Sequence, residues 1–222
     1  MGQFWQRLTS ATKTIGRMVF VECAGDIGVI IGAVLAAFLA TNIAGAIVSP
    51  ADLDPVVRTR IAYVVPIVTI SVVFLATSLF HLKLVTRHER LRRSLVYAVA
   101  IGIALLLVKV ALQGTNELRY DFSVSSILFV FSTCLVAPFC EELFFRGYVW
   151  SKLRARNYDD RLIVVCTTLL YMMPHLPGSA AAFLEYATIG VCLGLICYFS
   201  GGILLSFVFH ALMNLIVVFG VN

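Results

Sequence analysis

The chain has 222 residues, of which 60% are hydrophobic and only 13% are charged. Soluble domains carry roughly twice that share of charged residues, so this composition, with a mean hydropathy of +0.96, excludes an ordinary soluble domain. The formal net charge is +5, but the basic residues lie between apolar runs. That placement indicates contact with lipid headgroups and argues against a nucleic-acid partner.

The first 25 residues predict an amphipathic helix that lies in the membrane interface. Apolar residues recur there at helical spacing, on the face opposite three cations; the apolar ones are Trp5, Leu8, Ala11, Ile15 and Met18, and the cations are Arg7, Lys13 and Arg17. The charged part and the apolar run after it are both too long for a signal peptide.

Seven apolar runs follow, each near the length of about 17–25 residues that crosses a hydrocarbon core. They are residues 27–48, 61–80, 94–112, 124–150, 161–175, 181–199 and 203–221. The sequence therefore predicts an all-α, polytopic integral membrane protein with about seven transmembrane helices. We expect a single membrane domain over residues 1–222, with the interfacial helix at 1–25, three spans within 27–123 and a four-span core at 124–221.

The loops between these runs predict the orientation. The N-terminal segment and the loops after the second and fourth runs fall on one side and carry Arg7, Lys13, Arg17, Lys83, Arg87, Arg90, Arg92, Arg93, Lys152, Arg154, Arg156 and Arg161. The opposite side carries Arg58, Arg60 and Arg119, offset by Asp52, Asp54, Glu117 and Asp121. By the positive-inside bias, we expect an inner or plasma membrane protein with a cytoplasmic N-terminus, an external C-terminus and anionic headgroups against its cytoplasmic face.

The six cysteines lie in or beside apolar runs and show no paired C-x-x-C spacing; they are Cys23, Cys134, Cys140, Cys166, Cys192 and Cys197. This pattern indicates small buried hydrophobic side chains, and it argues against a disulfide framework or a zinc knuckle.

The segment from Pro138 to Trp150 contains three ionisable residues, Glu141, Glu142 and Arg146, within an apolar run that is predicted to span the bilayer. Ionisable groups at that depth are functional-site candidates by default. Glu142 and Arg146 are four residues apart, so on a helix they share a face and can neutralise each other. Glu141 is turned about 100° away and has no partner in its own segment. A carboxylate left in this way suits a general base.

Two histidines also lie in predicted spans. His210 and Asn214 are four residues apart and share a helical face, so they offer two hydrogen-bond donors to one point, as an oxyanion requires. His175 ends the fifth run, with Tyr171 one turn before it on the same face. Counting about 1.5 Å per residue from the cytoplasmic ends puts Glu141 and His210 at similar depths and His175 somewhat deeper.

Three motifs stand in order in the second half of the chain. They are E-E-L-F-F-R-G at Glu141 to Gly147, Y-M-M-P-H at Tyr171 to His175 and H-A-L-M-N at His210 to Asn214. Together they resemble the E-E-x-x-x-R, F-x-x-x-H and H-x-x-x-N motifs of the CAAX prenyl protease and bacteriocin-processing family. The resemblance covers residues 124–221, with Tyr171 in the place of the usual phenylalanine.

The resemblance implies an all-helical glutamate intramembrane protease that is independent of metal and cofactor. Glu141 would then act with His175 to activate water, and His210 with Asn214 would hold the tetrahedral oxyanion. The residues implied to support the site are Glu142, Arg146 and Tyr171. The substrate would be a membrane-associated peptide or protein, either a prenylated C-terminus or a leader peptide.

Two other functions remain open. A zinc-dependent membrane hydrolase fits because two histidines and a glutamate form a catalytic zinc set, although the chain has no H-E-x-x-H and its histidines lie on different spans. A non-proteolytic scaffold or regulator of a partner membrane protein belongs to a different class. Such a scaffold has no need of an unpaired carboxylate at Glu141, so Glu141→Gln would be silent in it.

Overall fold

The structure is a computed structural model that describes residues 28–36, 39, 55–78, 91–112, 124–175 and 178–219. Almost all of these residues are helical and none of them lies in a strand, so the all-α prediction is confirmed. The predicted interfacial helix at residues 1–25 lies outside the described residues, as does most of the first predicted span, of which residues 28–36 are helical.

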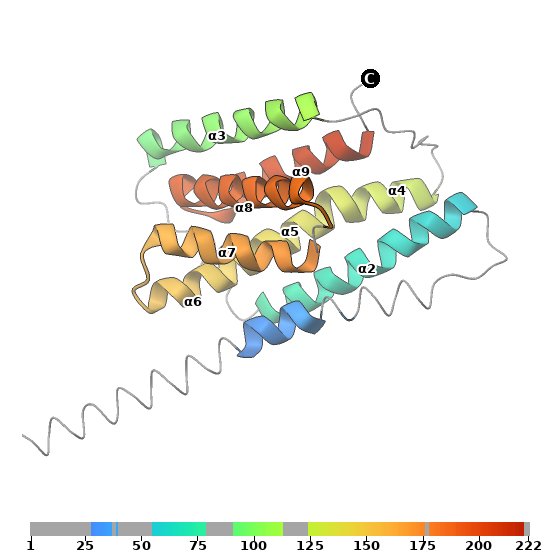
Figure 1. Ribbon diagram of the computed structural model, residues 1–222, viewed down its shortest axis with the longest axis horizontal. Coiled ribbons are helices and arrows are strands. Elements are labelled where there is room, and N and C mark those ends of the chain that lie inside the picture. The colour runs from blue at the N-terminus through green and yellow to red at the C-terminus, as the bar shows by residue number, and fades with distance from the viewer. Residues whose placement is uncertain are drawn as a thin grey trace, which may run out of the picture.

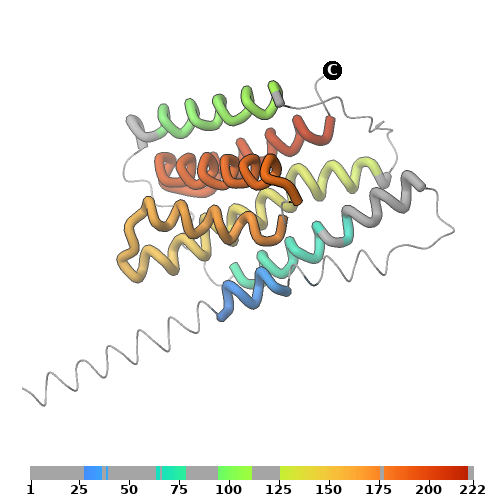
Figure 2. Tube along the Cα trace, viewed as in Figure 1, coloured from blue at the N-terminus to red at the C-terminus, as the bar shows by residue number. Residues whose placement is uncertain are grey.

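The helices follow the predicted apolar runs. After α2 (Pro55–Ser78) and α3 (Leu91–Leu112), one continuous helix runs from Val124 to Ala155, and α7 (Asp160–His175), α8 (Ala180–Ser200) and α9 (Ile203–Phe219) complete the described bundle (Figures 1 and 2). Pro174 does not end the α7 helix before the predicted histidine, because the helix includes both Pro174 and His175.

The continuous helix changes its winding twice. It consists of α4 (Val124–Phe131), the π-helical turn η2 (Ser132–Val136), α5 (Ala137–Glu142), the π-helical turn η3 (Leu143–Val149) and α6 (Trp150–Ala155). π-helical turns are rare and occur frequently at functional sites. Both predicted glutamates lie at the end of α5, between these two turns, and Arg146 lies within η3.

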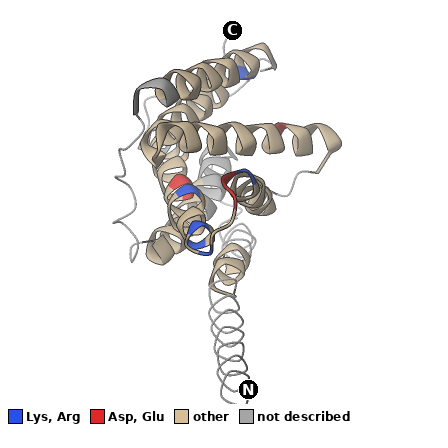
Figure 3. Ribbon diagram, turned by 90° about the vertical axis from the view of Figure 1, so that its left-hand side faces the viewer, with Lys and Arg blue, Asp and Glu red and all other residues tan. Residues whose placement is uncertain are grey.

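Two of the described helices are long and apolar enough to cross a membrane. They are Ser126–Ala155 and Ala180–Ser200, each with a mean hydropathy of 1.8, and only 39% and 33% of these windows is buried within the protein. A core helix of a soluble domain would instead hide its apolar surface. Leu204 on α9 is 71% exposed, and Figure 3 shows few charged residues along the described helices. These two helices are candidate spans, and the seven-span topology remains a prediction.

Small residues let the helices approach closely, as is common between membrane helices. α8 packs against α3, α7 and α9, and the continuous helix packs against α2 and α9. A Cβ atom on Gly190 of α8 would lie 2.8 Å from Cγ2 of Thr168 on α7, and one on Gly102 of α3 would overlap the ring of Phe209 on α9. Near its N-terminus, α8 is further tied to α3 by an ion pair between Glu185 and Lys109.

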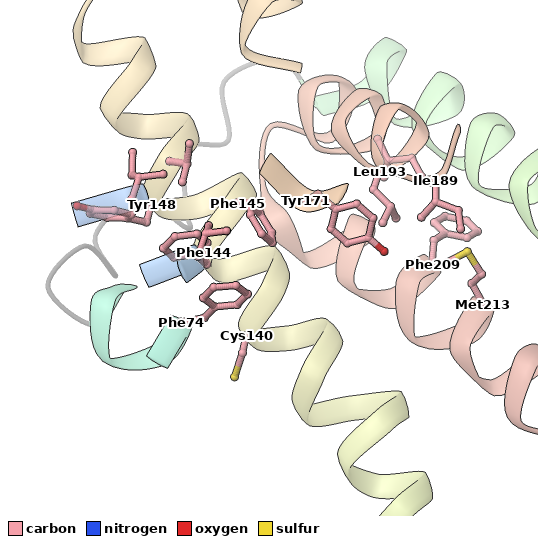
Figure 4. Close-up of a cluster of buried hydrophobic side chains, with 14 of the residues drawn as sticks. Phe74, Cys140, Phe144, Phe145, Tyr148, Tyr171, Ile189, Leu193, Phe209 and Met213 are labelled. Carbon is pink, nitrogen blue, oxygen red and sulfur yellow. The ribbon is translucent and has the colours of Figure 1, made fainter. Parts of the chain in front are cut away.

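An aromatic core joins these helices around the predicted site. Phe74 of α2 stacks on Phe144 with ring centroids 4.3 Å apart, and Phe145 meets the Tyr171 ring edge-on at 5.8 Å. Tyr171 lies between these phenylalanines and the α8 and α9 side chains Leu193 and Phe209 (Figure 4). The core therefore places the α7 motif beside the glutamates.

Candidate active site

Glu142 is the centre of a buried hydrogen-bond network. Its side chain is 0% exposed, and its Oε1 accepts hydrogen bonds from Nη1 of Arg146 at 2.9 Å and from Nδ1 of His210 at 3.0 Å. The ion pair that the four-residue spacing predicts is thus present. The Arg146 guanidinium also donates to the Gly190 carbonyl at 3.1 Å and lies 5.0 Å from the centre of the Tyr171 ring. This network links the continuous helix to α7, α8 and α9.

Glu141 has a different environment, although it is the neighbouring residue. Its side chain is 15% exposed, and its Oε2 lies 3.8 Å from Nε2 of His210. This oxygen is buried and has no hydrogen-bond partner in the described part of the chain. A buried carboxylate oxygen with unused acceptor capacity can accept a proton from a bound water molecule.

His210 lies between the two carboxylates and turns one ring nitrogen toward each. An ionised carboxylate only accepts hydrogen bonds, so Nδ1 of His210 donates to Glu142, and Nε2 is the nitrogen that faces Glu141. The sequence placed His210 with Asn214, but it carried no signal for the contact with Glu142, because spacing within a helix does not report contacts between helices.

Asn214 is held against the first π-helical turn. Its Nδ2 donates to the carbonyl of Thr133 in η2 at 2.9 Å. An asparagine amide carries two N–H donors, so this bond fixes the side chain and leaves a second donor. The structure therefore orients Asn214 through a residue that lies outside the three motifs.

Tyr171 lies next to both His175 and His210. The Tyr171 ring centroid is 4.6 Å from that of His175 and 5.9 Å from that of His210. Nδ1 of His175 lies 2.8 Å from the carbonyl oxygen of Tyr171. Among the described residues, no hydrogen bond or ion pair joins His175 directly to Glu141.

The structure also bears on metal binding and on cysteine chemistry. Within the described ranges, no group of three or more His, Cys, Asp or Glu side chains is arranged to hold a metal ion. The described cysteines are free thiols; Cys134, Cys140 and Cys197 are buried, and Cys166 and Cys192 are half-buried. Cys23 lies outside the described residues.

A cavity of about 310 Å³ lies on the Arg146 side of the network, between the end of the continuous helix and the α8–α9 turn. Its walls include Trp150, Arg154 and Tyr198. None of the residues predicted to act on water or on the oxyanion lines this cavity, so it is a feature separate from the Glu141 side.

Part of the chain matches a protein-family model. Residues 123–216 match the model described as type II CAAX prenyl endopeptidase Rce1-like. None of the curated proteins and none of the solved structures gives a significant match to the chain. The matched range contains all three motifs, from Glu141 to Asn214. Residues 123–216, which are 94 of the 222 residues, are therefore similar to the CAAX protease family.

Proposed function

We propose that the protein is a metal-independent, glutamate-type endopeptidase that hydrolyses a peptide bond in a membrane-associated peptide or protein. The observation that carries the proposal is the environment of Glu141. Its Oε2 is buried without a partner, 3.8 Å from a histidine whose other nitrogen is already bound to Glu142. Oε2 of Glu142 is also buried without a partner, but Oε1 of Glu142 is held by Arg146 and His210, whereas no hydrogen bond from the described residues holds Glu141. A general base needs a carboxylate that is free to accept a proton.

In the proposed reaction, Glu141 takes a proton from a water molecule, assisted by His175, and the oxygen of that water attacks the scissile carbonyl carbon. The carbonyl oxygen becomes an oxyanion that accepts hydrogen bonds from Nε2 of His210 and Nδ2 of Asn214. Protonated Glu141 then gives its proton to the leaving nitrogen as the carbon–nitrogen bond breaks. Glu141 thereby returns to its ionised state.

The network around Glu142 supports this assignment electrostatically. His210 can donate from Nε2 to an oxyanion while Nδ1 donates to Glu142 only if the ring carries both protons. With Arg146, an imidazolium at His210 gives two positive charges against the two carboxylates, so the buried cluster is neutral overall. Glu142 and Arg146 thus have a supporting role that extends to the charge of the oxyanion donor.

The function is tested by comparing the membrane proteomes of cells that carry the wild type or Glu141→Gln. We expect uncleaved termini of the substrate to accumulate with the variant. The substrate found in this way is then incubated with detergent-solubilised, chelator-treated protein. Identical proteomes and normal cleavage by Glu141→Gln would favour the scaffold function, and activity that a chelator abolishes and zinc restores would favour the zinc hydrolase.

The proposal includes seven spans in an inner or plasma membrane, with the N-terminus in the cytoplasm and the C-terminus outside. The basic loops would contact anionic headgroups, and a further membrane protein could be a partner. Topology reporters fused after Arg93 and Arg156 should behave as cytoplasmic, and one fused after Asn222 should behave as external. A cytoplasmic C-terminus would remove one span from this arrangement.

A further inference from the structure

Tyr186 of α8 lies against His175, although no motif includes it. The two ring centroids are 4.6 Å apart with an interplanar angle of 41°, which equals the distance and angle between His175 and Tyr171. Tyr171 precedes His175 by one turn on the same helix. Tyr186 comes from the next helix, so its contact links the end of α7 to α8.

The hydrogen bond of His175 decides which nitrogen is free. A backbone carbonyl is only an acceptor, so Nδ1 of His175 carries the proton that it donates to Tyr171 at 2.8 Å. In the neutral ring, Nε2 then has the lone pair. His175 is the last residue of α7, and its half-buried ring needs tertiary contacts to stay in this orientation.

The part of α8 that carries Tyr186 is anchored to a neighbouring helix. Glu185, the preceding residue, forms an ion pair with Lys109 on α3. Tyr186 therefore packs on His175 from a helix that is anchored to α3 beside it.

We propose that Tyr186 is a positioning residue of the active site, whose ring holds His175 in the orientation that keeps Nδ1 on the Tyr171 carbonyl and presents Nε2 to the water that Glu141 activates. This inference rests on the proposed function. A displacement of a catalytic group by about 1 Å can lower the rate on the order of 100-fold. A ring that fixes the position of His175 therefore affects the rate of catalysis.

The first test observes His175 itself. Full-length protein with ¹⁵N-labelled histidine rings is reconstituted in lipid nanodiscs, and the His175 signals are assigned from their loss in His175→Gln. In the wild type and in Tyr186→Phe, we expect a protonated Nδ1 and an unprotonated Nε2. In Tyr186→Leu, we expect averaged signals from a ring that has lost its orientation. The matched control is Tyr198→Leu, the same change at an exposed tyrosine of the same helix, and it should keep the wild-type signals.

The second test uses the substrate identified by membrane proteomics. Tyr186→Leu should lower kcat by about 10–100-fold with little change in KM, and Tyr186→Phe should restore most of that loss. Unchanged His175 signals or an unchanged kcat in Tyr186→Leu would overturn the inference. If the wild-type protein cleaves nothing, the proposed function fails, but the ring signals still decide whether Tyr186 orients His175.

Discussion

Glu141 and Glu142 are adjacent in the sequence and have opposite environments in the structure. Glu142 is completely buried and its Oε1 accepts hydrogen bonds from two basic side chains, whereas Glu141 is 15% exposed and accepts no hydrogen bond from the described residues; Oε2 is buried without a partner in both carboxylates. Successive helical residues point about 100° apart. Glu142 can therefore lie in the hydrogen-bond network with Arg146 while Glu141, on the same turn, faces the proposed position of the substrate. The comparison teaches that a buried oxygen without a partner does not by itself identify the base, and that partial exposure and the lack of a hydrogen bond from a basic side chain are what distinguish Glu141 from Glu142.

The largest expected effect is the loss of kcat when Glu141 is replaced. Glu141→Gln keeps the shape of the side chain and removes the proton acceptor, so kcat should fall by about 10²–10⁴-fold while the folded yield stays at the wild-type level. Cleavage of the reconstituted substrate and size-exclusion chromatography measure the two quantities.

The comparator is Glu142→Gln, the same substitution one residue later. It weakens the bonds to Arg146 and His210, so it should reduce both the folded yield and kcat. Equal behaviour of the two variants in both measurements would show that the two carboxylates do not have separate tasks.

A second prediction concerns how much the ion pair between Glu142 and Arg146 stabilises the protein. Arg146→Ala leaves the buried charge of Glu142 with His210 but without its arginine, and breaking a buried ion pair from one side costs roughly 3–5 kcal/mol. The free energy of unfolding, measured by denaturant titration in mixed micelles, should fall by that amount.

The control for this change is Arg154→Ala, which removes an arginine paired with Asp160 at the surface, where its side chain is 63% exposed. Exposed pairs contribute about 0–1 kcal/mol. The double variant with Glu142→Gln and Arg146→Met should recover part of the stability that Arg146→Ala loses. An Arg146→Ala protein as stable as Arg154→Ala would contradict a structural role for the pair.

A third prediction separates the oxyanion from the base. Asn214→Ala removes one proposed donor, so kcat should fall on the order of 10²–10³-fold and a trace of activity should remain. Combined with Glu141→Gln, the loss should be smaller than the product of the single losses, because residues that act as one unit are not additive. Multiplicative losses would show that the two residues act in separate steps.

The sequence predicted the helices well because apolar runs of spanning length are a strong local signal, and the ends of α7 and α8 differ from the predicted runs by at most one residue. It also predicted the bond between Glu142 and Arg146, which is set within one helix. It did not predict the contacts of His210 with Glu142, of Asn214 with Thr133 or of Tyr186 with His175. Each of these joins two helices, and helix packing depends on the shapes of whole faces, which residue spacing does not encode.

The smallest expected effect comes from a change in how closely α8 packs against α7 beside the hydrogen-bond network of Glu142. The carbonyl of Gly190 accepts a hydrogen bond from Arg146, and a Cβ atom at this position would meet Thr168. Gly190→Ala should therefore push α8 away from α7, and overpacking of this kind costs typically 1–3 kcal/mol. Thermal unfolding of the purified protein measures the change.

Gly32→Ala is the matched control, because Gly32 is also helical and has nothing within 4 Å of its missing Cβ. Alanine favours a helix over glycine by about 1 kcal/mol, so the control should unfold at the same or a slightly higher temperature.

The rate of cleavage by Gly190→Ala should show whether Gly190 acts on stability or on catalysis. Because Gly190 touches the network of Glu142 and not Glu141, Gly190→Ala should lower stability more than it lowers kcat, and a selective loss of kcat at full stability would mean that α8 packing acts directly on the base.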